Sequence, residues 1–213
     1  MMNIYLIRHG RQCSDLCNVN VPLCDAGKRQ AALLGTRLLG YHIDKIYSSD
    51  LIRAVETAQI INESFHVEHE VIPAFREISF GDLEGLSDDE IKERFGDFTK
   101  RRKLRLSDEA YPGGECGRDV YERAMPEILK ITEQKEENVA IVTHGGLIRA
   151  ILAGILGDDF SVKLVFAKDL ENCSITQLRY EKEEKQFYIE RVNDFAHLEA
   201  EESLLRKHFK KGF

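Results

Sequence analysis

The segment Asn3–Arg8 restricts the fold of this chain more than any other part of the sequence. It is a nearly continuous apolar run that ends abruptly in an arginine. Strands of this kind are buried on both faces, as in a parallel sheet that helices cover on each side. The segment therefore predicts an inner strand of a parallel sheet.

The rest of the chain alternates between strand-like and helix-like segments. Six strands are predicted, at Asn3–Arg8, Lys45–Ser48, Val67–Ile72, Val139–Thr143, Ser174–Arg179 and Phe187–Val192, with a charged hairpin turn at Glu181–Lys185 between the last two. Most are followed by an amphipathic helical pattern. Such alternation predicts an α/β fold with a mostly parallel sheet covered on both faces.

Five helices and a helical tail are predicted from periodicity and capping residues. The five helices begin at Asp25, Leu51, Ser87, Asp119 and Leu147. Asp25 is expected to cap the first, Ser87 to form a capping box with Glu90, and Pro126 to kink the fourth. The charged tail from about His197 predicts a surface helix. The 213 residues suit one domain, and residues 81–118, which lack a clear strand, predict a small helical lid.

Charge and hydropathy exclude several classes of partner. The net charge of −7 argues against binding to nucleic acid or to a membrane surface. The apolar stretch Ile4–Ile7 is too short for a signal peptide or a membrane span, so we expect a cytoplasmic protein. The basic run Lys100–Arg105 is a local exception to the negative net charge. It is either a solvated helix face or a site for extra anionic groups of a substrate.

The five cysteines are expected to be reduced thiols, because their number is odd and no export signal is apparent. The irregular spacing of Cys13, Cys17 and Cys24, with no matching histidine pair, disfavours a structural zinc site. Cys13 and Cys17 follow the first strand closely, and a redox role for them stays open.

Chemically capable residues follow four of the predicted strands. They are Arg8 and His9 after the first, Asp50 and Arg53 after the second, Arg76 and Glu77 after the third, and His144, Gly145 and Gly146 after the fourth. Ligands of open α/β sheets bind outside the carboxyl ends of the strands, so we expect these residues to share one site.

This set of residues predicts phosphoryl transfer. Two guanidinium groups suit a dianionic phosphate, and glycines at a helix N-terminus let backbone N–H groups approach an anion. A neutral imidazole beside such cations can attack phosphorus, and a carboxyl group can protonate the leaving oxygen. Arginines and a second histidine can carry the transition-state charge, so we expect no metal and no cofactor.

The segment Leu6–Gly10, LIRHG, resembles the signature of the histidine phosphatase superfamily, also called phosphoglycerate mutase-like. Four more motifs follow in the family's order, at Tyr47–Ala54, Phe75–Gly81, Tyr111–Glu115 and Val142–Gly146, and the resemblance runs from residue 3 to about 197. It implies a three-layer α/β/α sandwich. It also implies His9 as the phosphorylated nucleophile, Arg8 and Arg53 as phosphate-binding arginines, His144 as the second histidine and Glu77 as the proton donor.

Two positions leave alternatives open. Many family members have a phosphate-contacting asparagine six residues after the nucleophile, where this chain has Asp15. Either Asn18 takes that role by a different loop path, or the contact is missing. Asp82 and Glu84 lie close to Glu77 in sequence and compete with it as the proton donor.

The resemblance is strongest to the phosphatase branch. The modest lid and short loop after the first motif favour hydrolysis of small phosphorylated metabolites, such as sugar phosphates or α-ribazole-phosphate-like monoesters. A cofactor-dependent phosphoglycerate mutase is the alternative. A non-catalytic binding relative is disfavoured, because such a protein has no need for Glu77. We expect a small phosphorylated substrate, and the sequence leaves open whether the chain forms a homodimer.

Overall fold

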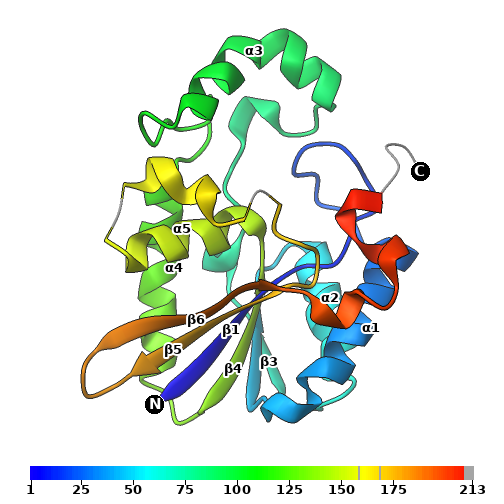
Figure 1. The fold of residues 1–213 in the computed structure, drawn as a ribbon, viewed down its shortest axis with the longest axis vertical. Coiled ribbons are helices and arrows are strands. Elements are labelled where there is room, and N and C mark those ends of the chain that lie inside the picture. Colours follow the sequence, from blue (N-terminus) through cyan, green and yellow to red (C-terminus); the bar gives the residue numbers. More distant parts are fainter. Residues whose placement is uncertain (158, 168, 209–213) are drawn as a thin grey trace.

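A computed structural model describes residues 1–157, 159–167 and 169–208. The strands are β1 (Met2–Arg8), β2 (Lys45–Ser48), β3 (Glu68–Val71), β4 (Asn138–Thr143), β5 (Ile175–Glu181) and β6 (Gln186–Asp194). They form one sheet in the order β3-β2-β4-β1-β5-β6 (Figure 1). The first four are parallel, while β5 runs antiparallel to β1 and to β6. The predicted six-stranded, mostly parallel sheet is confirmed.

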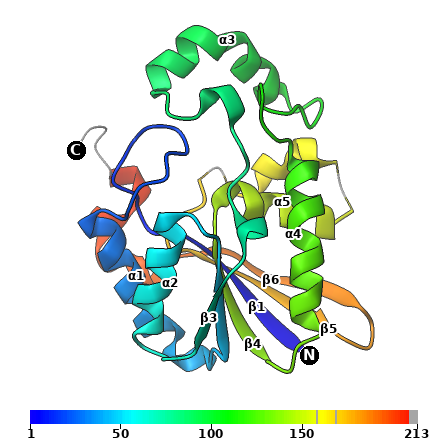
Figure 2. The same ribbon diagram turned by 180° about the vertical axis from the view of Figure 1, so that it is seen from behind.

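Helices cover both faces of this sheet, as the α/β prediction requires. They are α1 (Asp25–Leu38), α2 (Ile52–Asn62), α3 (Asp88–Leu104), α4 (Gly117–Thr132) and α5 (Gly145–Ile155). Helices α1 and α2 lie on one side of the sheet and α4 and α5 on the other (Figure 2). The capping box between Ser87 and Glu90 is present at the start of α3.

The side chains of β1 divide between two hydrophobic cores. Ile4 and Leu6 pack with residues of α4 and α5, whereas Tyr5 and Ile7 pack with residues of α1 and α2. All four are buried, because successive side chains of a strand point to opposite faces and both faces are covered. This double burial explains why the N-terminal segment is a continuous apolar run.

Three local predictions about the helices are wrong. The residue that caps α1 is Cys24, and Asp25 is the first residue of the helix. Helix α4 runs unbroken through Pro126. The interrupted helix is α3, in which Phe95 leaves helical geometry with φ −124° and ψ 20°. Helix α5 also begins earlier than predicted, at Gly145.

The C-terminal tail differs most from its prediction. Instead of one surface helix it forms three short 3₁₀ turns, Ala196–Leu198, Glu202–Leu204 and Arg206–His208. Leu204 and Leu205 are buried beside α1, and the Gln30 side-chain amide donates a hydrogen bond to the Leu204 carbonyl. These tertiary contacts override the helical preference of the charged sequence.

The excursion at residues 81–118 places α3 above the carboxyl ends of the parallel strands (Figure 1). Two backbone hydrogen bonds fasten its ends together, from Asp82 to the Pro112 carbonyl and from Glu115 to the Ser79 carbonyl. Gly81, with φ +54°, allows this contact, because a Cβ there would meet the Pro112 carbonyl oxygen at 2.1 Å. No helix in the described part of the chain is long and apolar enough to cross a membrane.

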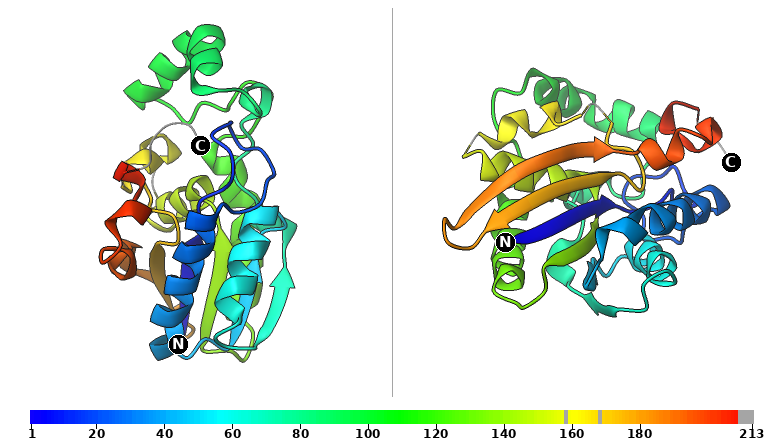
Figure 3. Two further views of the ribbon diagram at one scale, coloured as in Figure 1. Left: turned by 90° about the vertical axis from the view of Figure 1, so that its right-hand side faces the viewer. Right: turned by 60° about the horizontal axis from the view of Figure 1, so that its bottom comes forward.

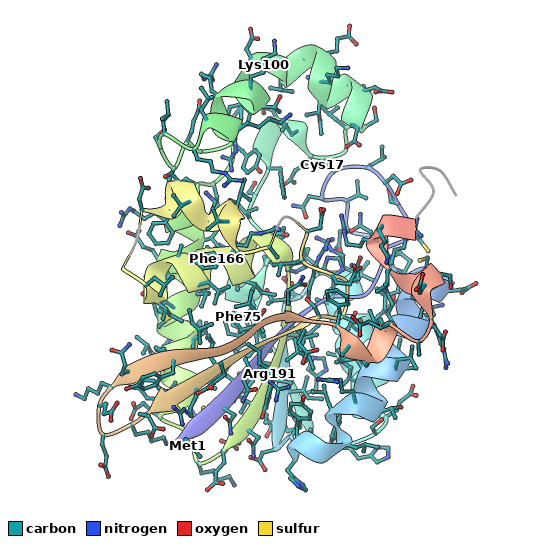
Figure 4. All side chains as sticks on the ribbon, in the orientation of Figure 1. Met1, Cys17, Phe75, Lys100, Phe166 and Arg191 are labelled. Atoms are coloured by element: carbon teal, nitrogen blue, oxygen red, sulfur yellow. The ribbon has the colours of Figure 1, made fainter. Side chains whose placement is uncertain are left out.

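Phe75 begins the third motif, Phe75–Gly81, and tests how far that segment depends on the core. Its ring is fully buried, near the middle of the molecule in Figure 4. Phe75→Ala should lower the free energy of unfolding by about 3–5 kcal/mol, measured by urea denaturation. Leu106→Ala is the control, since Leu106 is 81% exposed, and it should change that free energy by less than about 0.5 kcal/mol. Equal effects of the two substitutions would contradict the assigned core.

Candidate active site

The parallel register brings most of the predicted site residues together. Arg8 pairs with Thr143 between β1 and β4, and Ser48 pairs with Val142 between β2 and β4, so the three strands end at one edge. A cavity of about 910 Å³ opens there. Of the predicted site residues, those lining it are Arg8, His9, Asn18, Arg53 and Glu77. Asp50 and Arg76 are exceptions, because they form an ion pair with each other and are not among the described residues that line the cavity.

His9 is held in one tautomer. Its Nδ1 lies 2.7 Å from the Gly10 carbonyl oxygen, which can only accept a hydrogen bond, so Nδ1 carries the proton. Its Nε2 accepts a hydrogen bond of 3.2 Å from Nε of Arg53. The Asn172 side-chain amide also donates to the His9 carbonyl, at 2.9 Å. The free lone pair of the ring is therefore on Nε2, beside a guanidinium group.

Arg53 lies in the first turn of α2 and is 2% exposed. Besides His9, its guanidinium donates to the Val19 carbonyl at 3.0 Å and to Oδ1 of Asn18 at 2.7 Å. Asn18 adopts a left-handed conformation, and its amide donates to Glu84. Asn18 thus positions Arg53 through the 11–24 loop, and its role as a phosphate ligand stays a prediction.

His144 is fully buried next to His9, with 5.0 Å between the ring centroids. Its Nε2 is 2.8 Å from the hydroxyl of Ser49, at the end of β2. Its Nδ1 has no hydrogen-bond partner among the described residues. Burial lowers the pKa of both histidines well below the ordinary value, and positive charge from Arg53 and Arg8 adds to the effect. Both rings are therefore neutral at neutral pH.

Arg8 ends β1 on the same face as Leu6, toward α5. Its guanidinium donates to the Leu170 carbonyl, and its Nε has no described partner. Burial, with a further contribution from Arg206, lowers the pKa of Arg8 to about 9, so that it stays charged at neutral pH. Gly145 lies beside it, since a Cβ on Gly145 would sit 3.7 Å from Nε of Arg8.

Glu77 occupies the N-terminus of α5. Its two carboxylate oxygens accept hydrogen bonds from the backbone N–H groups of Gly146 and Leu147, each at 3.2 Å, and one also accepts from Ile78 at 2.9 Å. A Cβ on Gly146 would lie 2.3 Å from Glu77 Oε1, which explains the second glycine of the motif. The anion that the N–H of Gly146 meets here is the Glu77 carboxylate.

The rival proton donors lie elsewhere. Glu84 accepts hydrogen bonds from Asn18, Ser79 and Phe80 and fastens two loops to each other. Neither Asp82 nor Glu84 is among the described residues that line the cavity, whereas Glu77 is. The position of Glu77 therefore supports its assignment as the proton donor.

An ion pair missed by sequence reasoning fixes the Glu77 segment. Arg123 on α4 contacts the Glu115 carboxylate at 2.8 Å and donates to the carbonyls of Ala74, Arg76 and Glu77. Glu115 in turn accepts from the Ser79 backbone N–H at 2.8 Å. The Tyr111–Glu115 motif thus has a structural role. Glu115 was visible in that motif, but no pattern indicated its partner 8 residues later.

The C-terminal segment forms one wall of the cavity, which sequence reasoning also missed. Glu199, Glu202, Leu205 and Arg206 all line it, and the segment lies next to the 11–24 loop (Figure 3). Cys17, in the 11–24 loop near α3 (Figure 4), also lines the cavity, and burial raises the pKa of its thiol to about 11. Cys17 is therefore a poor nucleophile.

Comparison with known proteins agrees with this site. The histidine phosphatase superfamily (branch 1) matches residues 4–194. The chain therefore belongs to this superfamily, and it is a phosphatase by class.

Individual relatives support the same assignment. The phosphatase PhoE of Bacillus subtilis (strain 168) is 30% identical, covering 86% of this chain and 91% of its own. A 2,3-bisphosphoglycerate-dependent phosphoglycerate mutase of Bartonella henselae is 32% identical, covering 72% and 81%. The solved structure of a mycobacterial glucosyl-3-phosphoglycerate phosphatase with inorganic phosphate is 26% identical, with a TM-score of 0.82, covering 92% and 99%.

The buried histidines make a prediction about pH. Because their pKa values are lowered in the folded protein, His9 and His144 should stay neutral between pH 8 and 5.5. Nitrogen-edited NMR should show His9 with a protonated Nδ1 and a bare Nε2 throughout. In the urea-unfolded control both rings should titrate near pH 6.5. The unfolded chain then binds the extra protons, so each ring should cost about 1.4 kcal/mol of stability per pH unit below 6.5. A titration midpoint near 6.5 in the folded protein would contradict the prediction.

Proposed function

We propose that this chain is a metal-independent phosphatase that hydrolyses small phosphorylated metabolites through a phosphohistidine on His9. The observation that carries the proposal is the unprotonated Nε2 of His9, which faces Nε of the buried Arg53 in a cavity that Arg8 also lines. Two guanidinium charges bind a dianionic phosphate and take up charge in the transition state.

In the first step, Nε2 of His9 attacks phosphorus and the bond from phosphorus to the ester oxygen breaks. Glu77, in its protonated form, gives its proton to the departing oxygen, so that an alcohol leaves. Arg53 Nε, which donates to His9 Nε2 in the unliganded site, turns its hydrogen bond to a phosphoryl oxygen. The hydrogen bond from Nδ1 to Gly10 stabilises the positive charge that develops on the ring.

In the second step, water attacks the phosphohistidine. The Glu77 carboxylate takes a proton from that water, the bond from phosphorus to Nε2 breaks, and inorganic phosphate leaves. Glu77 thus regains in the second step the proton that it gave in the first, and the enzyme returns to its starting form. We assign His144, whose buried Nδ1 has no described partner, as the donor to the phosphoryl group in both steps, with Gly145 next to it in the chain.

Hydrolysis is favoured over transfer to a second substrate, although the relatives include both phosphatases and mutases. A cavity of about 910 Å³ is far larger than a phosphate and leaves space for water next to His9. The same volume suits a sugar phosphate or an α-ribazole-phosphate-like monoester. A cofactor-dependent phosphoglycerate mutase is the second candidate.

His9→Ala tests the nucleophile. Wild type should release phosphate from p-nitrophenyl phosphate in the presence of EDTA, because arginines rather than a metal bind the phosphate. His9→Ala should reduce release to the rate of the buffer alone. Mass spectrometry after a rapid alkaline quench should find phosphate on His9 of the wild type.

Three outcomes of this experiment would redirect the proposal. Release that persists in His9→Ala would show that another group is the nucleophile, and loss of wild-type activity in EDTA would show that a metal takes part. Interconversion of 3-phosphoglycerate and 2-phosphoglycerate with catalytic 2,3-bisphosphoglycerate, without net phosphate release, would establish the mutase.

Glu77→Gln tests the proton donor. The amide cannot give a proton to the leaving oxygen, so kcat for an alkyl phosphate such as glycerol 3-phosphate should fall by about 10²–10⁴-fold. The fall should be much smaller for p-nitrophenyl phosphate, because nitrophenolate leaves without protonation. Glu84→Gln is the matched control and should not separate the two substrates. A uniform loss on both substrates in Glu77→Gln would contradict the assignment.

A further inference from the structure

A second, smaller cavity opens off the proposed phosphate site. Its volume is about 250 Å³. The residues that line both cavities are Arg8, Glu77, Phe80, Asp169 and Arg206. Because Glu77 faces the leaving oxygen in the proposed reaction, the shared wall puts the second cavity where the alcohol part of a substrate would extend.

Positive charge dominates this second cavity. Among the described residues that line it, the cationic ones are Arg8, Arg102, Arg149, Lys163 and Arg206, and the acidic ones are Glu77 and Asp169. Lys163 is buried in an ion pair with Asp108, so its charge is compensated. Arg8 serves the phosphate. Arg102, Arg149 and Arg206 take no part in the proposed reaction at His9. Arg149, on α5, donates to the carbonyls of Phe166 and Ala167, whereas Arg102 and Arg206 come from the excursion and from the C-terminal segment.

Arg102 is fixed by uncharged partners. Its guanidinium stacks 4.0 Å from the centroid of the Tyr111 ring and donates to the Glu109 carbonyl oxygen. Its neighbours in the basic run differ: Arg101 pairs with the Glu109 carboxylate at 2.8 Å, and Lys100 pairs with Asp97 on the outer side of α3 (Figure 4). Of the run Lys100–Arg105, Arg102 alone is among the described lining residues.

Arg206 reaches the same place from the C-terminal segment. Its backbone N–H donates to the Glu171 carboxylate at 3.1 Å, which anchors the residue. Its guanidinium donates to Oδ1 of the Asn172 side chain at 3.4 Å and stands 4.0 Å from the Asp169 carboxylate. Arg206 lines both cavities and so lies on the wall that they share.

We propose that the second cavity binds a second anionic group, a carboxylate or a phosphate, on the alcohol part of the substrate, with Arg102 and Arg206 as its ligands. A guanidinium group held by stacking and by carbonyl oxygens is preorganised to bind such a group through two parallel hydrogen bonds. The volume accepts an anionic group together with several carbon atoms. This inference rests on the proposed function and selects, within it, monoesters that carry two anionic groups.

Binding to the inactive His9→Ala protein tests the subsite apart from turnover. Calorimetric titration would compare 3-phosphoglycerate with glycerol 3-phosphate, which lacks the carboxylate, and fructose 1,6-bisphosphate with fructose 6-phosphate, which lacks the second phosphate. At least one pair should differ in Kd by about tenfold or more, as a charge-assisted hydrogen bond provides. The pair that differs identifies the anion.

Two arginine variants, each on the His9→Ala background, locate the effect. Arg102→Gln should reduce the Kd ratio of the discriminating pair to below about twofold, and Arg206→Gln should reduce it as well. Arg101→Gln, one residue away and paired at the surface, should keep the full ratio. Circular dichroism melting of each variant shows that it is folded, and the two arginine variants check each other because they lie on different segments.

The outcomes separate the two proposals. Equal Kd values within both ligand pairs, or an unchanged ratio in both arginine variants, would overturn the subsite even if the wild type hydrolyses aryl phosphate. Discrimination that depends on Arg102 supports the subsite. If it occurs while the wild type hydrolyses nothing, the phosphatase proposal fails and the anion subsite stands.

Discussion

The hydrogen bond from His9 Nδ1 to the carbonyl of the next residue is the interaction on which the chemistry of this protein depends. It assigns the single ring proton and so leaves Nε2 bare. Backbone geometry alone provides it, at the point where β1 ends. The backbone around it is held in turn, by Thr143 accepting from the His9 N–H and by Asn172 donating to the His9 carbonyl. The proposed nucleophile is thus fixed by strand pairing rather than by another titratable side chain.

The site concentrates positive charge that the fold itself does not neutralise. Arg53 is buried and Arg8 is partly buried, and their described hydrogen bonds go largely to carbonyl and amide oxygens. Burying a charge without a counter-charge is costly, and the carboxylate in reach, Glu77, is bound to the N-terminus of α5. A phosphate dianion would supply the missing charge. The arrangement therefore trades stability of the unliganded protein for affinity toward an anion.

Segments remote from the sheet edge decide what surrounds the phosphate. The Arg123–Glu115 ion pair holds the Glu77 loop to α4, and backbone contacts at Gly81 and Gly114 close the excursion that carries α3. Tyr111 then supports Arg102 from the same excursion. One motif thereby links the placement of the proposed proton donor to the placement of the cation proposed to bind the leaving group. The general chemistry depends on strand ends, while selectivity depends on the excursion and the C-terminal tail.

The sequence alone determined the sheet, the two-sided burial of β1 and the clustering of His9, Arg53, Glu77 and His144, because these follow from periodicity and from residues adjacent to strand ends. Tertiary structure decided the rest. The tail folds as 3₁₀ turns because Leu204 and Leu205 bury against α1, Asn18 turns to Arg53, and Gly146 gives its N–H to Glu77. Each of these depends on a partner between 35 and 174 residues away, and local sequence patterns carry no information about such distant contacts.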